Sequence, residues 1–314
     1  MSVMAWLLDS DPSIRWQTLR DLADAPDDVV SAERARVATE GWGARLLSLR
    51  DEDGQWAGGA CFPAHHDWSA KTDGQPWTST LHTLELLREF GLDPESDQAV
   101  DTVTLVRQNC RWEHAGQPFF SGEVEPCING RTVALGAYFG QDVSAVVNRL
   151  LGEQLDDGGW NCWTESGSVR SSFHTTICVL EGLLAFEQSF GTTAPVTDAR
   201  RRAQEYLLER HLLRRVSTGD LIEPRWTQCA FPTLWHYDVL RGLDYLRGAG
   251  VQPEGRVEEA VATLRERRQV DGRWLLDVRH RDTLHEELAG TVGAPNRWIT
   301  LRALRVLHWY AGQD

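Results

Sequence analysis

A cysteine and a histidine are the residues in this sequence best suited to hold a metal ion. Cys127 and His174 occupy the same position in two adjacent helical segments, so we expect their side chains to meet on one wall. Zinc prefers thiolate and imidazole ligands, and a site with three protein ligands leaves a fourth position open for catalysis. The alternative is that Cys127 is a small buried hydrophobic residue and His174 a hydrogen-bonded residue in the first turn of a helix.

A second group of residues suits proton transfer. His82, Arg131 and Asp238 stand at one common position of their helical segments, and His236 lies two residues before Asp238. Asp238 and His82 could act as general acid and base, and Arg131 could anchor an anionic group. The alternative is a buried ion network that fixes neighbouring helices.

These residues belong to six segments that share the same spacing of apolar positions. The segments begin near Ser13, Thr78, Cys127, His174, Leu234 and Pro295. Three of them end at a glycine that can take the left-handed conformation found after helices, in Phe90-Gly91, Phe139-Gly140 and Phe190-Gly191. The first and last segments match closely, with Arg15-Trp16-Gln17-Thr18-Leu19-Arg20 against Arg297-Trp298-Ile299-Thr300-Leu301-Arg302. We therefore expect the two chain ends to lie side by side and to close a ring.

A polar stripe runs along the six segments. One turn after the first position stand Gln17, His82, Arg131, Cys178, Asp238 and Ile299. Three residues further stand Arg20, Glu85, Ala134, Glu181, Arg241 and Arg302, which are charged in every segment but the third. An inner helix has no face on bulk solvent, so such a stripe must line a cavity or pair across helix contacts. We expect a polar lumen, with the charged residues of this last set forming structural ion pairs.

An acidic turn followed by tryptophan recurs between the segments, in Gly54-Gln55-Trp56, Gly158-Gly159-Trp160 and Gly272-Arg273-Trp274. We expect each tryptophan to wedge an outer helix against the next inner one. More charged amphipathic stretches, expected as outer helices, include residues 32–49, 97–106, 198–213 and 257–269. Alternating inner and outer helices predict an all-α fold, with one (α/α)6 toroid as a single domain over residues 1–314.

Composition narrows the partners and the compartment. The formal net charge is −14 and no basic run is present, which argues against nucleic acid as a partner. No apolar run reaches the roughly 20 residues that span a bilayer, and the first residues lack the pattern of a signal peptide, so we expect a cytoplasmic protein without membrane insertion. The six cysteines are scattered, as expected of reduced thiols, and most of the 14 tryptophans are expected in the core. His280 and His285 fall in a loop and are expected on the surface.

The alternation of helices with acidic Gly-x-Trp turns resembles the repeats of squalene cyclases and of protein prenyltransferase β subunits, over nearly the whole chain. Ser172 to Leu183 resembles the prenyltransferase segment whose histidine binds zinc, and Glu125-Pro126-Cys127 lies one repeat earlier, where that family has an acid-x-Cys pair. The resemblance implies a zinc site at Glu125, Cys127 and His174, with Cys162 as the substitute ligand. The chain differs at residues 119–124, which lack the basic residues that hold a diphosphate in prenyltransferases, and it has no Asp-x-Asp-Asp motif of triterpene cyclases.

Three functions are compatible with these features. The first is a terpenoid cyclase-like or prenyltransferase-like enzyme that acts on an apolar or isoprenoid-like small molecule in the central cavity, with zinc as a possible cofactor and Asp238 or His82 moving protons. The second is a carbohydrate-active enzyme of the same architecture, with Asp238 and either Glu125 or Glu181 as acid and base. The third is a non-catalytic binding module that needs a protein partner or a second copy of itself.

Overall fold

The computed structural model describes residues 1–67, 76–280, 285, 288 and 290–312. Its regular elements are helices, and the described residues form only isolated β-bridges besides. This confirms the all-α class expected from the sequence. In the part of the chain that is described, no helix is both long and apolar enough to cross a membrane.

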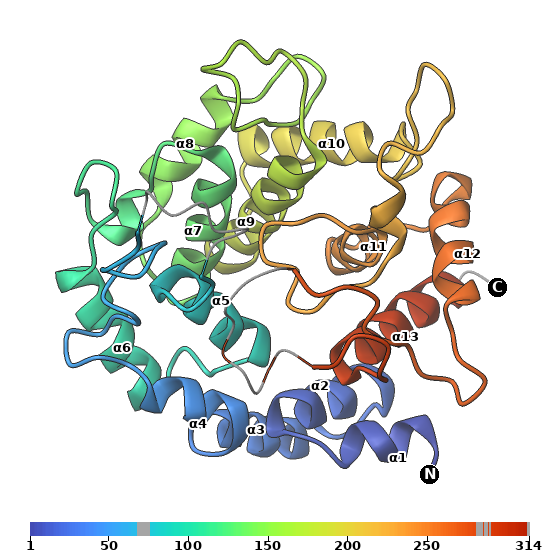
Figure 1. The fold of residues 1–314 in the computed structure, drawn as a ribbon, viewed down its shortest axis with the longest axis horizontal. Coiled ribbons are helices and arrows are strands. Elements are labelled where there is room, and N and C mark those ends of the chain that lie inside the picture. The colour runs from blue at the N-terminus through green and yellow to red at the C-terminus, as the bar shows by residue number, and fades with distance from the viewer. Residues whose placement is uncertain (68–75, 281–284, 286–287, 289, 313–314) are drawn as a thin grey trace.

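Figure 1 shows two concentric sets of helices around a common centre. The inner set contains α2 (Pro12–Leu22), α5 (Thr80–Phe90), α7 (Pro126–Tyr138), α9 (Phe173–Phe190), α11 (Val239–Gly248) and α13 (Arg297–Ala311). The outer set contains α3 (Asp27–Ala35), α4 (Gly41–Ser48), α6 (Asp97–Asn109), α8 (Ser144–Gly152), α10 (Ala194–Leu208) and α12 (Glu258–Glu266), and the short α1 (Val3–Leu8) precedes α2. Four 3₁₀ turns complete the described elements, η1 (Arg36–Ala38), η2 (Phe119–Ser121), η3 (Pro224–Thr227) and η4 (Gly255–Val257). This arrangement is the expected toroid.

Several boundaries differ from the expectation, among them α10, which covers residues 194–208 instead of 198–213. The fifth inner helix begins at Val239 rather than near Leu234, because Asp238 caps it and the preceding residues form turns. The first outer stretch is two helices, α3 and α4, and α4 starts at Gly41 with a φ of 61°. Gly91 is left-handed helical and Gly140 has a positive φ of 66°, whereas Gly191 has a positive φ with an extended ψ of 160°.

The ring closes where the two ends of the chain meet. Arg305 on α13 donates to the Gln17 side chain on α2 at 2.6 Å and pairs with Asp21 at 2.5 Å. Arg297 donates to the Asp9 carbonyl at 3.0 Å, and its guanidinium lies 4.6 Å from the centre of the Trp6 ring. These contacts confirm that the ends lie side by side (Figure 1).

The repeated tryptophans connect each outer helix to the next inner helix. Each indole N–H donates to a carbonyl in an outer helix, with Trp56 on Leu46, Trp160 on Leu150 and Trp274 on Leu264, at 2.7 to 2.8 Å. Each tryptophan backbone N–H donates to a threonine hydroxyl on an inner helix, with Trp56 on Thr80, Trp160 on Thr176 and Trp274 on Thr300, at 3.0 to 3.2 Å. The three rings are at most 1% exposed, so each fills core volume as well as joining two helices. The expected wedging role is confirmed.

One joint of the inner ring is built from small residues. A Cβ on Gly182 would lie 2.2 Å from the Gly130 carbonyl oxygen, and a Cβ on Gly130 would lie 2.5 Å from the Cys178 carbonyl oxygen. Helices α7 and α9 therefore approach backbone to backbone, and Ala134 and Ala185 pack at the same contact. This contact explains why the third segment has alanine where the others carry a charge.

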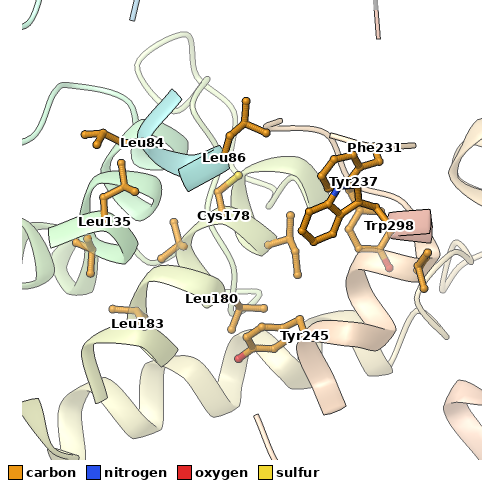
Figure 2. Close-up of a cluster of buried hydrophobic side chains, with 14 of the residues drawn as sticks. Leu84, Leu86, Leu135, Cys178, Leu180, Leu183, Phe231, Tyr237, Tyr245 and Trp298 are labelled. Atoms are coloured by element: carbon orange, nitrogen blue, oxygen red, sulfur yellow. The ribbon is translucent and has the colours of Figure 1, made fainter. Parts of the chain in front are cut away.

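The position just before the charged one in each segment is apolar, and from the second segment onward it is buried between the inner helices and their neighbours. Leu84, Leu180 and Leu301 have no exposed surface, and Leu240 is 2% exposed. Figure 2 shows Leu84 and Leu180 among the core side chains of α5, α7, α9 and the segments around α11 and α13. The polar stripe of the same helices is thereby turned toward the centre.

The connection made by Trp160 gives a stability prediction. We expect Trp160→Phe to lower the free energy of unfolding by about 2–3 kcal/mol, because the Leu150 carbonyl loses its donor and a cavity opens. The measurement is chemical denaturation followed by circular dichroism. The matched control is Trp163→Phe in the following loop, where the ring is 72% exposed and a change within about 0.5 kcal/mol is expected. Equal losses in the two variants would contradict the connecting role.

Candidate functional site

A cavity of about 590 Å³ lies at the centre of the inner helices. This volume is within the range typical of sites for small molecules. Its deep wall includes the buried residues His82, Leu234 and Arg241, whereas Arg20 and Gln188, from the last turns of α2 and α9, are exposed. The cavity therefore opens toward the C-terminal ends of the inner helices.

The expected polar lumen is present, and most of its charged side chains are paired across helix contacts. Arg131 on α7 forms a close bidentate pair with Glu85 on α5. Arg241 on α11 donates two hydrogen bonds to Glu181 on α9, at 2.7 and 2.8 Å. Burial alone would raise the pKa of Glu181, but the charge and hydrogen bonds of Arg241 outweigh it and lower that pKa. Glu85 and Glu181 thus have the structural role expected of them.

The structure brings His82 and Arg131 together. Arg131 Nη2 lies 2.7 Å from His82 Nδ1, and because a guanidinium only donates, Nδ1 must be the acceptor. His82 Nε2 then carries the proton and donates to the Cys61 carbonyl at 3.2 Å. Burial, followed by the Arg131 charge, lowers the pKa of His82 well below its usual value, so the ring is neutral. Both ring nitrogens are engaged in the resting structure.

Asp238 is not part of the cavity lining among the described residues. Its carboxylate caps α11, accepting from the backbone N–H of Arg241 at 2.8 Å and of Ala230 at 3.4 Å. Burial raises the pKa of Asp238. The expected ring of His82, Arg131 and Asp238 is therefore a contact of the first two, with Asp238 in a capping position.

The metal-like group differs in composition from the expected one. The ligand atoms of Glu125, Cys127 and Cys162 all lie within 4.8 Å of one another, and within the described ranges no other group of three His, Cys, Asp or Glu residues meets this criterion. The Cys127 thiol donates to Glu125 at 3.5 Å. A hydrogen bond with Cys127 lowers the pKa of Cys162, and the same bond together with burial raises that of Cys127. Cys162 is therefore a member of the group together with Glu125, not the substitute ligand that was expected.

His174 does not join this group. Its Nδ1 accepts from the Tyr237 backbone N–H at 2.8 Å, and its ring lies among Trp226, Trp235 and His236, with centroids 5.1 to 5.9 Å away. Cys127 and His174 occupy the same position in their two segments, which predicted that their side chains would meet. His174 instead contacts Tyr237 and the aromatic rings. The structure places His174 in an aromatic cluster beside the thiol group.

A stack of histidines extends this aromatic cluster. The ring of His236 lies against the ring of His280 at 3.6 Å, nearly parallel, and against the Trp235 ring at 3.9 Å. Burial lowers the pKa of His236 to about 2 and those of His174 and His280 to about 4. His280 is only partly exposed, contrary to the surface position expected, and His285 hydrogen-bonds Thr83 at 3.0 Å. Nothing in the sequence around His280 and His285 indicates that these two side chains contact the helices of the toroid.

Known proteins resemble the chain only through structure. No family model matches the sequence, and no curated protein matches it either. The type II terpene cyclase MstE from Scytonema, without ligand, is 17% identical, with 97% of this chain and 88% of that chain covered at a TM-score of 0.45. An MstE variant with the substrate geranylgeranyl dihydroxybenzoate is 17% identical, with 99% of this chain and 88% of that chain covered at a TM-score of 0.43. A variant with the product merosterolic acid A is 16% identical, with 97% of this chain and 87% of that chain covered at a TM-score of 0.44.

The histidine stack gives a prediction for the pH dependence of stability. Its depressed pKa values mean that the unfolded chain takes up protons below about pH 6.5 while the folded chain does not, so stability falls as pH falls through that value. We expect His236→Phe, which keeps an aromatic ring in the stack, to reduce this slope between about pH 4.5 and 6 by up to ~1.4 kcal/mol per pH unit. Denaturation curves at several pH values measure it. His114→Phe, at an exposed site, should leave the slope unchanged, and an unaltered slope in His236→Phe would contradict a buried neutral ring.

Proposed function

We propose that this protein is an enzyme of the terpenoid cyclase-like or prenyltransferase-like type, which holds a small molecule in its central cavity and binds zinc through Glu125, Cys127 and Cys162. The observation that carries the proposal is this group of two thiols and a carboxylate at the first turn of α7, one of the inner helices. Cys127 lies one helical turn before Arg131 on α7, a rise of about 6 Å. Arg131 in turn contacts His82 and Glu85, which both line the cavity.

The donor set fits zinc. Two thiols and a carboxylate are ligands that zinc accepts, and three protein ligands leave a position for water or substrate. Both thiols are partly buried. Cys127 lies in the first turn of α7, where the helix dipole opposes the rise in its pKa that burial and the hydrogen bond with Cys162 cause. A bound zinc would lower the pKa of a water molecule or of a substrate thiol and so supply a nucleophile.

The residues of the chain itself would orient the substrate. Trp16, Leu86 and Phe231 offer apolar surface in the cavity for an isoprenoid-like part. His82 is the wall residue placed to exchange a proton, on condition that substrate displaces one of its two hydrogen bonds. Asp238 has a structural role, because its carboxylate caps α11 and binds the turns before that helix.

The carbohydrate alternative has less support. Its acid and base would be Asp238 with Glu125 or Glu181, but Asp238 caps a helix and Glu181 is paired bidentately with Arg241. Neither carboxylate is placed to protonate a glycosidic oxygen. The partner-module alternative is tested by light scattering, because an active monomer would exclude an obligatory second chain.

The zinc centre is tested by metal analysis. We expect protein reconstituted with zinc and then desalted to retain about one zinc per chain, and both Cys127→Ala and Cys162→Ala to lose it, because two ligands cannot hold the ion tightly. Mass spectrometry of the metal content is the measurement.

Two variants serve as controls in the same experiment. Cys110→Ala removes a buried thiol outside the group, and His174→Ala removes the histidine expected from the sequence; both should keep the metal. Zinc retained by Cys127→Ala and Cys162→Ala, or absent from the reconstituted wild type, would refute the proposed centre.

A further inference from the structure

The cavity is positively charged inside an acidic protein. Six arginines line it, Arg20, Arg34, Arg88, Arg241, Arg247 and Arg302, against four carboxylates, Glu85, Glu89, Glu181 and Asp244. The chain as a whole has a formal charge of −14. An excess of buried or partly buried cations is costly unless an anion compensates it.

Three of the six arginines form close pairs with carboxylates in the structure. Arg241 pairs with Glu181, Arg247 with Asp244 at 2.8 Å, and Arg20 with Asp21 at 2.6 Å. Of the other three, Arg302 has longer ion pairs with two carboxylates, and Arg34 and Arg88 carry the excess charge.

Arg302 is the most buried of these three. Its side chain is 10% exposed, and its guanidinium lies 3.3 Å from Asp244 and 3.4 Å from Glu89. The atom nearest Asp244 is Nε, which forms an ion pair without the alignment of a hydrogen bond. Arg302 therefore adds a positive charge to the wall, which two carboxylates share at longer distances than in the close pairs.

Arg34 is held by neutral groups. Its Nε donates to the Gly91 carbonyl at 2.9 Å, and Nη2 donates to the Tyr138 hydroxyl at 3.0 Å. Burial raises the pKa of Tyr138, so its phenol is uncharged and donates to the Leu92 carbonyl at 2.7 Å. Over the part of the chain that is described, Arg34 and Arg88 form no ion pair with a carboxylate.

The three arginines converge on the last turn of α5. Arg88 belongs to that turn, Arg34 binds its final carbonyl region at Gly91, and Arg302 pairs with Glu89. Trp16 Nε1 and Gln17 Nε2 satisfy the neighbouring carbonyls of Phe90 and Glu89, at 2.7 and 3.0 Å. The carbonyl ends of the turn therefore have donors already, and the arginines exceed what capping the helix requires.

We propose that the cavity binds an organic anion, whose carboxylate, phosphate or sulfonate group lies against Arg34, Arg88 and Arg302 at the C-terminal end of α5. The apolar part of the ligand extends inward along Trp16, Leu86 and Phe231. The inference deepens the proposed function, since it rests on the cavity as the substrate site and names the charge of the substrate. It does not depend on the metal.

The test uses a pair of fluorescent probes of nearly the same shape, the sulfonate 1-anilinonaphthalene-8-sulfonate and the uncharged N-phenyl-1-naphthylamine. We expect the wild type to bind the sulfonate at least about tenfold more tightly than the neutral probe, as a charge-assisted hydrogen bond implies. Arg88→Gln should remove most of this preference and leave the affinity for the neutral probe unchanged. Arg88 is partly exposed and its side chain makes no ion pair with a described residue, so the variant is expected to fold.

Two further variants locate the bound probe. Arg201→Gln removes an arginine whose side chain is 74% exposed on α10, outside the cavity, and should bind both probes as the wild type does. Gly248→Trp places a large side chain on the cavity lining, where an added Cβ meets nothing within 4 Å, and should abolish binding of both probes. Circular dichroism confirms folding of each variant.

The outcomes separate this inference from the proposed function. Equal binding of the two probes, or a sulfonate affinity that Arg88→Gln leaves unchanged, overturns the anion site and leaves the cavity as a ligand site. Binding of neither probe to folded protein argues against the cavity as a ligand site, and so against the proposed function as well. Sulfonate binding that persists in Gly248→Trp places the probe elsewhere and overturns the inference.

Discussion

Buried pairs of arginine and carboxylate between neighbouring inner helices are the interaction on which the toroid depends. Arg131 with Glu85 joins α7 to α5, Arg241 with Glu181 joins α11 to α9, and Arg305 with Asp21 joins α13 to α2. Inner helices turn their apolar face to the surrounding core, so their polar face meets other inner helices and a cavity instead of bulk water. Removing one partner of such a pair leaves an uncompensated charge and costs about 3–5 kcal/mol. The helices must therefore close into a ring in which the charges of these three pairs meet.

Arg241 shows how the ring also builds the site. Besides Glu181, its guanidinium donates to the backbone carbonyls of Leu234 and His236, at 2.9 and 2.7 Å. Leu234 lines the cavity with a positive φ of 54°, a conformation that costs free energy for a residue with a side chain and that neighbouring contacts must hold. Arg241 thus connects α9 to α11, and it also holds the deep wall of the cavity at Leu234 and the beginning of the histidine stack at His236.

Much of this architecture could be predicted from the sequence, because periodic apolar positions and turn residues act locally. The repeated tryptophan turns and the charged position that recurs along the segments predicted the ring of helices. The match between residues 15–20 and 297–302 predicted that the ring closes. The fifth segment was misplaced, since periodicity alone does not show that Asp238 caps the helix and that the chain before it turns. The neighbours expected for His174 were wrong. The close approach of α7 and α9 at Gly130 and Gly182 sets the distance between these helices and their rotation, and the spacing of residues along the sequence contains neither quantity.

The direction of the inner helices explains why two different chemistries lie at opposite ends of the toroid. Alternation with outer helices makes all the inner helices run the same way, so their positive N-terminal ends form one level and their negative C-terminal ends another. The thiols and the carboxylate of Cys127, Cys162 and Glu125 gather near the first turn of α7, where a dipole favours anionic ligands. The arginines gather at the opposite level, beyond the last turn of α5. A ligand in the cavity would therefore have its anionic end at the opening and its other end toward the N-terminal level of the inner helices.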